Sequence, residues 1–358
     1  MKKIFLTSRD QFSGKSALAI GLSLALKEEG HNVGYFKPIG RRFKFGDGKE
    51  TDFDVQVVSK ILNLKEDYKD ICPILLDRDF ILEDMTKEKR KEYLNKIMTS
   101  FKKISKDYEI IIIEGQRTNQ TLASVGLCNP VLGRYLEAKS LLLTGGEAYT
   151  LIDDIFLQNE YFTANKAGIN GVIFNNVKSY AIPLIKEYSP IVKNRCNIET
   201  LGIIPMNTKL IAPTIAEIFN RVGGELLEKS TTINLMRLCE HTLVGAMSPE
   251  HAVKYFRRTH NNLIITGGDR PDLIISALEL PTTSCIILTG NIMPPNMVLT
   301  KAHEKNIPLI LVPHDTHGTS EICRHTPGYI TSENQEKIEL AKKTVMEHVD
   351  TKKILEFF

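Results

Sequence analysis

The segment Ser8 to Ser16, which reads SRDQFSGKS, constrains the fold of this chain most strongly. A short apolar run, Lys3 to Thr7, precedes it, and an amphipathic stretch, Ala17 to Glu29, follows it. A strand, a glycine-containing turn that ends in Gly-Lys-Ser, and a helix together form the context of a phosphate-binding loop. At the start of such a helix, free backbone N–H groups and the helix dipole favour an anion. The sequence therefore predicts a nucleotide-phosphate site at this turn.

Two side chains of this loop carry the predicted chemistry, although the loop departs from the usual spacing. Lys15 would reach the outer phosphates of a nucleotide, and the Ser16 hydroxyl would ligate Mg²⁺. The first glycine of the usual motif is replaced by Arg9 or, in a loop that is one residue longer, by Ser8. The alternative interpretation is an ordinary strand-to-helix turn with a solvated lysine.

Composition and charge indicate an ordinary globular protein. The chain has 358 residues, of which 42% are hydrophobic and 25% charged, and this length is typical of about two or three domains. The net charge of +3 does not argue for nucleic-acid or membrane binding. No apolar run approaches the ~18 residues that span a bilayer. The apolar stretch at the N-terminus is also too short for a secretory signal. Six scattered cysteines without a C-x-x-C pair indicate reduced thiols, so we expect a cytoplasmic protein.

Polar residues follow the second predicted strand, Val33 to Phe36. Lys37 comes directly after this strand, where side chains of a parallel sheet point into the ligand crevice. The alternative for Lys37 is a solvated lysine at a strand end. Asp52 and Asp54 precede a helical run, so they can be capping residues or Mg²⁺ ligands.

The run Glu109 to Glu114 contains four consecutive isoleucines and predicts a central strand buried on both faces. Glu114 ends this strand and is followed by Gly115. A carboxylate is costly at such a position unless it has a partner, so we predict that Glu114 contacts a metal ion or the substrate. Gln116, Arg117 and Thr118 follow in the same loop and could line the site.

Strands continue to alternate with helices, which predicts a doubly wound parallel sheet. Further strands are expected at Ser140–Leu143, Gly171–Asn176 and Leu201–Pro205. Asn175 and Asn176 end one of these strands, where an amide offers both a donor and an acceptor to the edge of an adenine. A plain turn is the alternative for both asparagines.

A second set of elements begins near Thr232, after a polar helical stretch from Ala212 to Ser230. Its strands are expected at Thr242–Gly245, Asn262–Thr266, Ser284–Leu288 and Leu309–Val312. The loops at their ends, including Thr266–Asp272 and His314–His317, could form an anion or nucleotide pocket or be capped turns. The segment Ser332 to Phe358 is predicted to be a helix with a Ser332-x-x-Gln335 capping box and a fraying end.

Taken together, these motifs resemble a known pair of domains. Residues 1–215 resemble the dethiobiotin synthetase-like P-loop domain found at the N-terminus of long bacterial phosphotransacetylases, and residues 230–330 resemble the DRTGG domain that follows it there. The first match is carried by Ser13–Ser16, Phe36–Ile39, the isoleucine run ending in Glu114-Gly115, Gly171–Asn176 and Leu201–Pro205. The second match is carried by Val244–Ser248 and Thr266–Asp272. We therefore expect an α/β protein with a P-loop NTPase-type doubly wound parallel sheet, a smaller α/β domain and a C-terminal helical tail at 331–358.

The resemblance implies a role for each matched residue. Gly14, Lys15 and Ser16 would bind the phosphates of ATP. Lys15 and Lys37 would be catalytic, with Lys37 facing phosphate or a carboxylate-derived intermediate. Mg²⁺ would be held by Ser16, Glu114 and an acid of the Asp52 and Asp54 pair. The nucleotide would also be bound by Asn175, which reads the adenine, and by Asn176 and Pro205.

The function expected from this resemblance is ATP and Mg²⁺ binding of regulatory character, with a second domain that senses a small-molecule ligand. The first alternative is an ATP-dependent ligase that activates a carboxylate or carbamate through an acyl phosphate. The second is a non-catalytic interaction scaffold, against which intact Lys15, Ser16 and Glu114 count. Acetyl transfer is not expected, because the sequence ends where a phosphotransacetylase catalytic domain would begin. A homodimer is expected from the resemblance, and neither nucleic acid nor a membrane is an expected partner.

Overall fold

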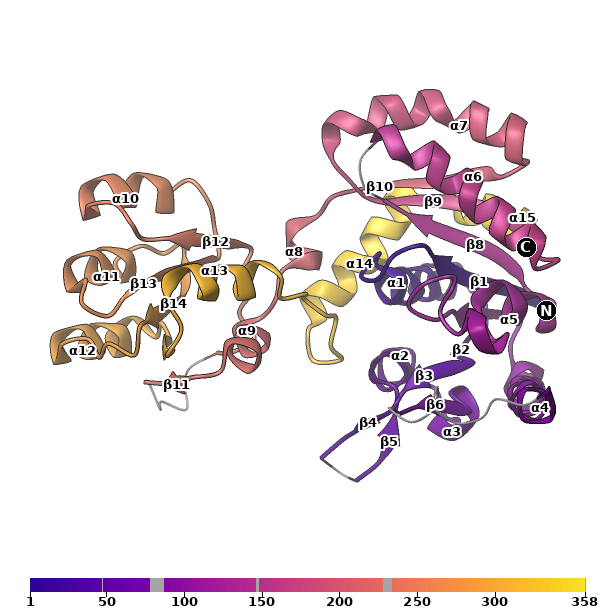
Figure 1. The fold of residues 1–358 in the computed structure, drawn as a ribbon, viewed down its shortest axis with the longest axis horizontal. Coiled ribbons are helices and arrows are strands. Elements are labelled where there is room, and N and C mark those ends of the chain that lie inside the picture. Colours follow the sequence, from indigo (N-terminus) through magenta and orange to yellow (C-terminus); the bar gives the residue numbers. More distant parts are fainter. Residues whose placement is uncertain (47, 78–86, 146–147, 228–233, 358) are drawn as a thin grey trace. The chain divides into compact units, whose positions relative to one another are not determined.

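The computed structural model describes residues 1–46, 48–77, 87–145, 148–227 and 234–357. The chain forms two compact units, of which one comprises Met1–Met206 together with Ile330–Phe358 and the other Asn207–Tyr329. The second unit is therefore inserted into the first, ahead of its last two helices (Figure 1). The predicted boundary at residue 230 lies outside the described residues.

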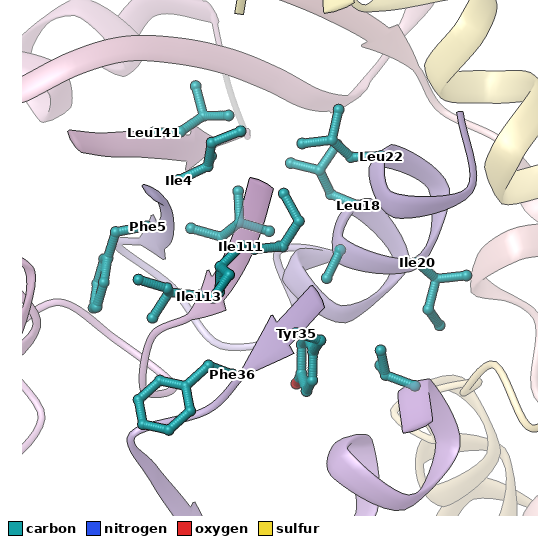
Figure 2. Packing of buried hydrophobic residues seen from close by; sticks show 14 of the residues in the cluster. Ile4, Phe5, Leu18, Ile20, Leu22, Tyr35, Phe36, Ile111, Ile113 and Leu141 are labelled. Atoms are coloured by element: carbon teal, nitrogen blue, oxygen red, sulfur yellow. The ribbon is translucent and has the colours of Figure 1, made fainter. Parts of the chain in front are cut away.

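The first unit is built on a six-stranded parallel sheet with the strand order β10-β9-β8-β1-β7-β2, so the predicted parallel α/β fold is confirmed. Its strands are β1 (Lys2–Ser8), β2 (Val33–Phe36), β7 (Ile110–Glu114), β8 (Lys139–Thr144), β9 (Ile169–Val177) and β10 (Glu199–Pro205). All five residues of β7 are buried, as expected for a central strand covered on both faces. Figure 2 shows how Ile4 and Ile111 of the sheet face Leu18 and Leu22 of the first helix.

Helices flank this sheet. They are α1 (Lys15–Glu28), α2 (Phe53–Leu62), α3 (Tyr68–Ile71), α4 (Lys87–Ile104), α5 (Asn129–Tyr135), α6 (Ala148–Ala164), α7 (Ile182–Cys196), α14 (Gln335–His348) and α15 (Thr351–Phe357). Short 3-10 helices lie at Ser105–Asp107, Ala123–Val125 and Ser179–Ala181. None of the helices in the described ranges is long and apolar enough to cross a membrane.

Two small sheets lie between β2 and β7, in a segment for which the sequence predicted no strands. β3 (Ile39–Arg41) pairs with β6 (Ile74–Leu76), and β4 (Phe43–Lys44) pairs with β5 (Glu50–Thr51). These strands are only two or three residues long, too short for a period-two pattern to reveal them.

The order of the connections places the candidate site at one edge of the sheet. β1 connects through α1 to β2 on one side, whereas β7 connects through α5 to β8 on the other side of β1. Ligands of open α/β sheets bind outside the carboxyl ends of the strands at such a reversal. The turns that follow β1 and β7 are therefore brought together by topology.

The second unit is a smaller α/β domain, as predicted. Its sheet has the order β11-β15-β14-β13-β12, in which only β11 is antiparallel to its neighbour. The strands are β11 (Glu225–Leu226), β12 (His241–Val244), β13 (Asn262–Gly267), β14 (Thr283–Thr289) and β15 (Leu309–Leu311). The helices are α8 (Thr208–Ile211), α9 (Ile215–Val222), α10 (Pro249–Phe256), α11 (Pro271–Leu278), α12 (Asn296–Lys305) and α13 (Thr316–Arg324). The predicted start near Thr232 lies outside the described part of the chain.

The C-terminal segment belongs to the first unit and differs from the predicted tail. Its helix α14 is capped by Asn334, whose side chain accepts a hydrogen bond from the Lys337 backbone, so the predicted Ser332 capping box was wrong. The predicted fraying end was also wrong, because α15 buries Ile354 completely. α14 packs against α1 where Gly21 leaves no side chain between the two helices.

Candidate functional site

The turn between β1 and α1 has the geometry of an anion-binding loop. Gly14 caps α1 in a left-handed conformation, with φ 90° and ψ 20°, and no side chain caps the helix. In the described part of the chain, the backbone N–H groups of residues 14–17 have no hydrogen-bond acceptor. Four unsatisfied donors at a helix start, together with the helix dipole, attract negative charge.

Lys15 places a buried positive charge at this turn. Its side chain is largely buried, with 8% of the residue exposed. Its Nζ atom donates to Ser8 Oγ at 2.5 Å and to the Arg117 carbonyl oxygen at 2.8 Å, and both acceptors are neutral. Burial lowers the pKa of Lys15 to about 8, although the Glu114 carboxylate opposes this effect. A buried ammonium without a carboxylate partner is costly, so a bound anion would stabilise it.

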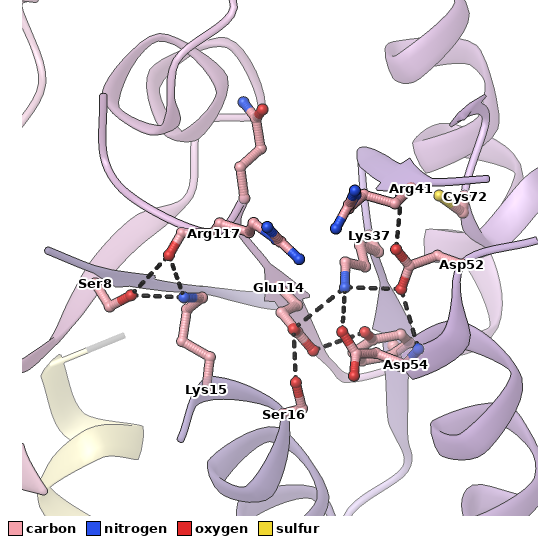
Figure 3. A network of polar contacts seen from close by, with 12 residues as sticks. Ser8, Lys15, Ser16, Lys37, Arg41, Asp52, Asp54, Cys72, Glu114 and Arg117 are labelled. Carbon is pink, nitrogen blue, oxygen red and sulfur yellow. Dashed lines mark hydrogen bonds and ion pairs between the residues drawn. The ribbon is translucent and has the colours of Figure 1, made fainter. Parts of the chain in front are cut away.

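Lys37, in contrast to Lys15, is surrounded by carboxylates (Figure 3). Its Nζ atom lies 2.8 Å from Asp52 Oδ1, 2.5 Å from Asp54 Oδ2 and 3.4 Å from Glu114 Oε1. Burial alone would lower the pKa of Lys37, but the three carboxylates raise it well above its usual value. The structure therefore brings together Lys37, Asp52, Asp54 and Glu114, which the sequence placed at three separate segments.

The two aspartates differ in what their oxygens do. Asp52 caps α2, since its Oδ1 accepts from the Asp54 backbone at 3.0 Å and its Oδ2 accepts from the Arg41 backbone at 2.7 Å. The capping interpretation of Asp52 is therefore confirmed. Asp54 lies in the first turn of α2 and contacts Lys37. Burial would raise the pKa of Asp54, but Lys37 and the Ser16 hydroxyl lower it below its usual value, so its carboxylate stays charged.

Glu114 ends β7 and connects the two lysine environments. Its Oε1 accepts a hydrogen bond from Ser16 Oγ at 3.0 Å, and its Oε2 accepts one from the Tyr35 hydroxyl at 2.8 Å. Burial raises the pKa of Glu114, and the Lys37 ammonium opposes that rise. Sequence reasoning missed Tyr35, although a hydroxyl on an otherwise apolar buried strand could have indicated a polar partner.

A network of side chains holds the loop that follows β7. Asn129 Oδ1 accepts from the Gln116 backbone at 2.8 Å, and Asn129 Nδ2 donates to Thr7 Oγ1 at 3.1 Å. The Gln116 side chain donates to the Leu127 carbonyl at 2.6 Å. These bonds fix the loop that carries the Arg117 carbonyl, which accepts a hydrogen bond from Lys15. Because the acceptor belongs to the main chain, no pattern of side chains in the sequence could have predicted this contact.

The predicted nucleobase residues lie at other strand ends. Asn175 Nδ2 donates to the Ser13 carbonyl at 2.7 Å, and its amide lies where a side chain on Gly14 would project. Asn175 therefore supports the phosphate-loop backbone. Asn176 is exposed at φ 58°, and Pro205 ends β10 opposite Val177. The nucleotide contacts of Asn175, Asn176 and Pro205 stay predictions.

The residues around Ser16 suit Mg²⁺ in their chemistry. No group of three or more His, Cys, Asp and Glu side chains in the described ranges is arranged to hold a metal by itself. Mg²⁺, however, takes only one or two carboxylates and completes its shell with phosphate oxygens and water. Ser16, Glu114 and Asp54 supply one hydroxyl and two carboxylates, and both acids contact the same ammonium. This set of oxygen donors fits a magnesium site that a nucleotide completes.

In the second unit, the predicted loops gather at the carboxyl ends of parallel strands. Arg270 Nη2 donates to the Met247 carbonyl at 3.1 Å, and the hydroxyls of Thr289 and Thr316 lie 2.9 Å apart. Asp315 caps α13, with its Oδ1 accepting from the Gly318 backbone. At Asp315 the capped-turn interpretation therefore holds.

Comparisons with known proteins match both parts of the chain. A family model described as the AAA domain matches residues 2–214, and a DRTGG domain model matches residues 217–326. The phosphate acetyltransferase of Nitrosomonas europaea is 22% identical over 365 residues, which cover 98% of this chain and 50% of that protein. The ATP-dependent dethiobiotin synthetase BioD of Methanococcus vannielii is 26% identical over 207 residues, which cover 56% of this chain and 92% of that protein. The chain thus spans about half the length of the phosphate acetyltransferases that it matches.

Proposed function

Because the chain belongs to the AAA domain family and carries a DRTGG domain, we propose that its first unit binds ATP together with Mg²⁺. The observation that carries this proposal is the buried ammonium of Lys15, whose hydrogen-bond acceptors are both neutral. It lies beside the unsatisfied N–H groups of residues 14–17. A polyphosphate supplies the negative charge that both features lack.

The metal ion would be held by Ser16, Asp54 and Glu114. We prefer Asp54 to Asp52 in this set, because both oxygens of Asp52 already accept backbone N–H groups at the start of α2 and in β3. When bound, Mg²⁺ neutralises charge on the phosphate oxygens. Lys15 binds the phosphates from one side of Glu114, and Lys37 faces the same space from the other side in the view of Figure 3.

We favour a regulatory role, in which the first unit binds the nucleotide and the DRTGG domain senses a small-molecule ligand. The ligase alternative is supported by Lys37, since a second lysine beside the phosphates suits the stabilisation of an acyl phosphate. The dethiobiotin synthetase relatives are named as ATP-dependent enzymes. A scaffold without nucleotide chemistry would have no use for a buried lysine at the loop.

The test is calorimetric titration with ATP, with and without Mg²⁺, of the wild-type chain and of Lys15→Ala. We expect the variant to bind ATP at least tenfold more weakly, a loss of about 1.4 kcal/mol or more. Lys27→Ala is the matched control, because Lys27 lies in the last turn of the same helix and donates to the Leu62 carbonyl. Equal affinities of wild type and Lys15→Ala would refute the phosphate-loop assignment.

A second measurement separates the regulator from the ligase. A ligase hydrolyses ATP faster once its acid and its amine or carbonate are present, whereas a regulator binds ATP without such stimulation. Phosphate release should therefore be followed across a panel of carboxylic acids and amines with bicarbonate. Stimulation that Lys37→Met abolishes, while ATP binding persists, would establish the ligase.

A further inference from the structure

Tyr35 is a fully buried tyrosine within a strand that otherwise carries no polar side chain. It lies in β2 between Gly34 and Phe36, and it has no exposed surface (Figure 2). A phenylalanine would fill almost the same volume in this core without a polar atom. A buried tyrosine hydroxyl is costly unless it makes a hydrogen bond, so Tyr35 needs a polar partner in the core.

The partner of Tyr35 is supplied by the register of the sheet. Tyr35 pairs with Ile112 of β7, and Ile112 and Glu114 project from the same face because side chains alternate along a strand. The Tyr35 hydroxyl donates to Glu114 Oε2 at 2.8 Å. A phenol is protonated near neutral pH, so Tyr35 is the donor in this bond.

The two carboxylate oxygens of Glu114 therefore have different partners. Oε2 is held from the core side by Tyr35, whereas Oε1 faces Ser16 at 3.0 Å and Lys37 at 3.4 Å. A carboxylate fixed at one oxygen cannot rotate freely, so the other oxygen keeps one direction. Partners of this kind, which orient a metal ligand without touching the metal, change metal affinity by about 10- to 100-fold.

We propose that Tyr35 is a positioning residue that turns one oxygen of Glu114 toward the cation of a bound Mg²⁺–nucleotide. The proposal rests on the proposed function, because it assumes that Glu114 ligates the metal. Its readout is the magnesium effect, defined as the ATP dissociation constant without Mg²⁺ divided by that with Mg²⁺. A merely structural role of Tyr35 would change both constants alike and leave this ratio unchanged.

The experiment is calorimetric titration of the full chain with ATP, with and without Mg²⁺, for the wild type, Tyr35→Phe and Tyr108→Phe. Tyr108→Phe is the matched control, because it removes a similar tyrosine-to-glutamate bond of 2.7 Å, to Glu66, elsewhere in the same unit. We expect Tyr35→Phe to reduce the magnesium effect about tenfold or more while ATP alone binds as before. Tyr108→Phe should keep the wild-type ratio.

Failure of the two proposals can be told apart. A clear magnesium effect in the wild type that Tyr35→Phe retains overturns the role of Tyr35 alone. A wild-type ratio of one overturns the metal site and the role of Tyr35 together. Should Tyr35→Phe not fold, Glu114→Asp gives a second test, because its carboxylate is one methylene too short to contact both Tyr35 and Ser16. A full magnesium effect in Glu114→Asp would also overturn the proposal.

Discussion

The Nζ atom of Lys37 lies 2.5 Å from Oδ2 of Asp54, in a buried cluster that also includes Asp52 and Glu114. Three carboxyl groups share this one ammonium, so the cluster carries more negative than positive charge when all three are ionised. A buried excess of charge is costly unless another cation compensates it. Lys37 and a divalent cation would therefore stabilise the same carboxylates.

Lys37→Met removes the ammonium and keeps a side chain of similar length. We expect the metal-free variant to be less stable by about 3–5 kcal/mol, because the partners of a broken buried pair remain uncompensated. Adding Mg²⁺ should raise the midpoint of thermal unfolding more in the variant than in the wild type, since the ion replaces the lost charge. Thermal unfolding with and without MgCl₂ tests this, and equal magnesium shifts in both proteins would contradict it.

Asp52→Asn and Asp54→Asn form a matched pair, because each removes one negative charge beside Lys37. We expect Asp54→Asn to reduce the magnesium effect on ATP binding by about tenfold or more, because the substitution removes a metal ligand. Asp52→Asn keeps an oxygen to cap α2 and should retain the effect. Calorimetry on both variants decides between the two acids, and equal losses would show that charge alone, and not ligation, controls the metal.

The polar residues of the site could be found in the sequence because each of them follows a strand or opens a helix. Lys37 follows an apolar strand, Glu114 ends one and Lys15 opens α1, and parallel topology brings these strand ends to one edge. Asp52 could not be separated from Asp54 in the sequence, since capping and metal binding use the same residue types. Only the direction of their oxygens distinguishes them.

Other contacts had no sequence signal that could be recognised. Ser8 stood out only as a departure from the loop motif, yet its hydroxyl accepts from Lys15. Tyr35 looked like an ordinary core residue, because hydrophobic patterns do not report where a hydroxyl points. The return of α14 to α1 joins segments separated by more than 300 residues, and an amphipathic pattern identifies a buried face without its partner.

The affinity for ATP should fall as the pH rises above about 8. Burial lowers the pKa of Lys15 to about 8 in the nucleotide-free protein, so the lysine is charged below this pH and neutral above it. Bound phosphate favours the charged form, and binding above pH 8 must therefore take up a proton. The association constant should be flat below this pKa and fall about tenfold for each further pH unit.

Calorimetry in buffers of different ionisation enthalpy measures this proton uptake directly. Lys15→Arg is the control, because a guanidinium keeps its charge throughout this range and should show neither uptake nor a falling affinity. An affinity of the wild type that stays constant between about pH 7 and 9 would show that the charge on Lys15 does not contribute to binding.

Gly21→Ala tests whether the C-terminal helix is part of the first unit's core. Alanine is favoured over glycine inside a helix by about 1 kcal/mol, so the substitution alone should stabilise α1. The added methyl group would meet the Ala341 carbonyl oxygen and the Val345 side chain of α14, and overpacking of this kind costs about 1–3 kcal/mol. We therefore expect a net loss of stability in urea unfolding.

Gly168→Ala is the control for this prediction, because it adds the same methyl group in open space on the same unit and should leave the unfolding midpoint nearly unchanged. A Gly21→Ala variant more stable than the wild type would mean that α14 does not pack closely on the helix that carries the phosphate loop.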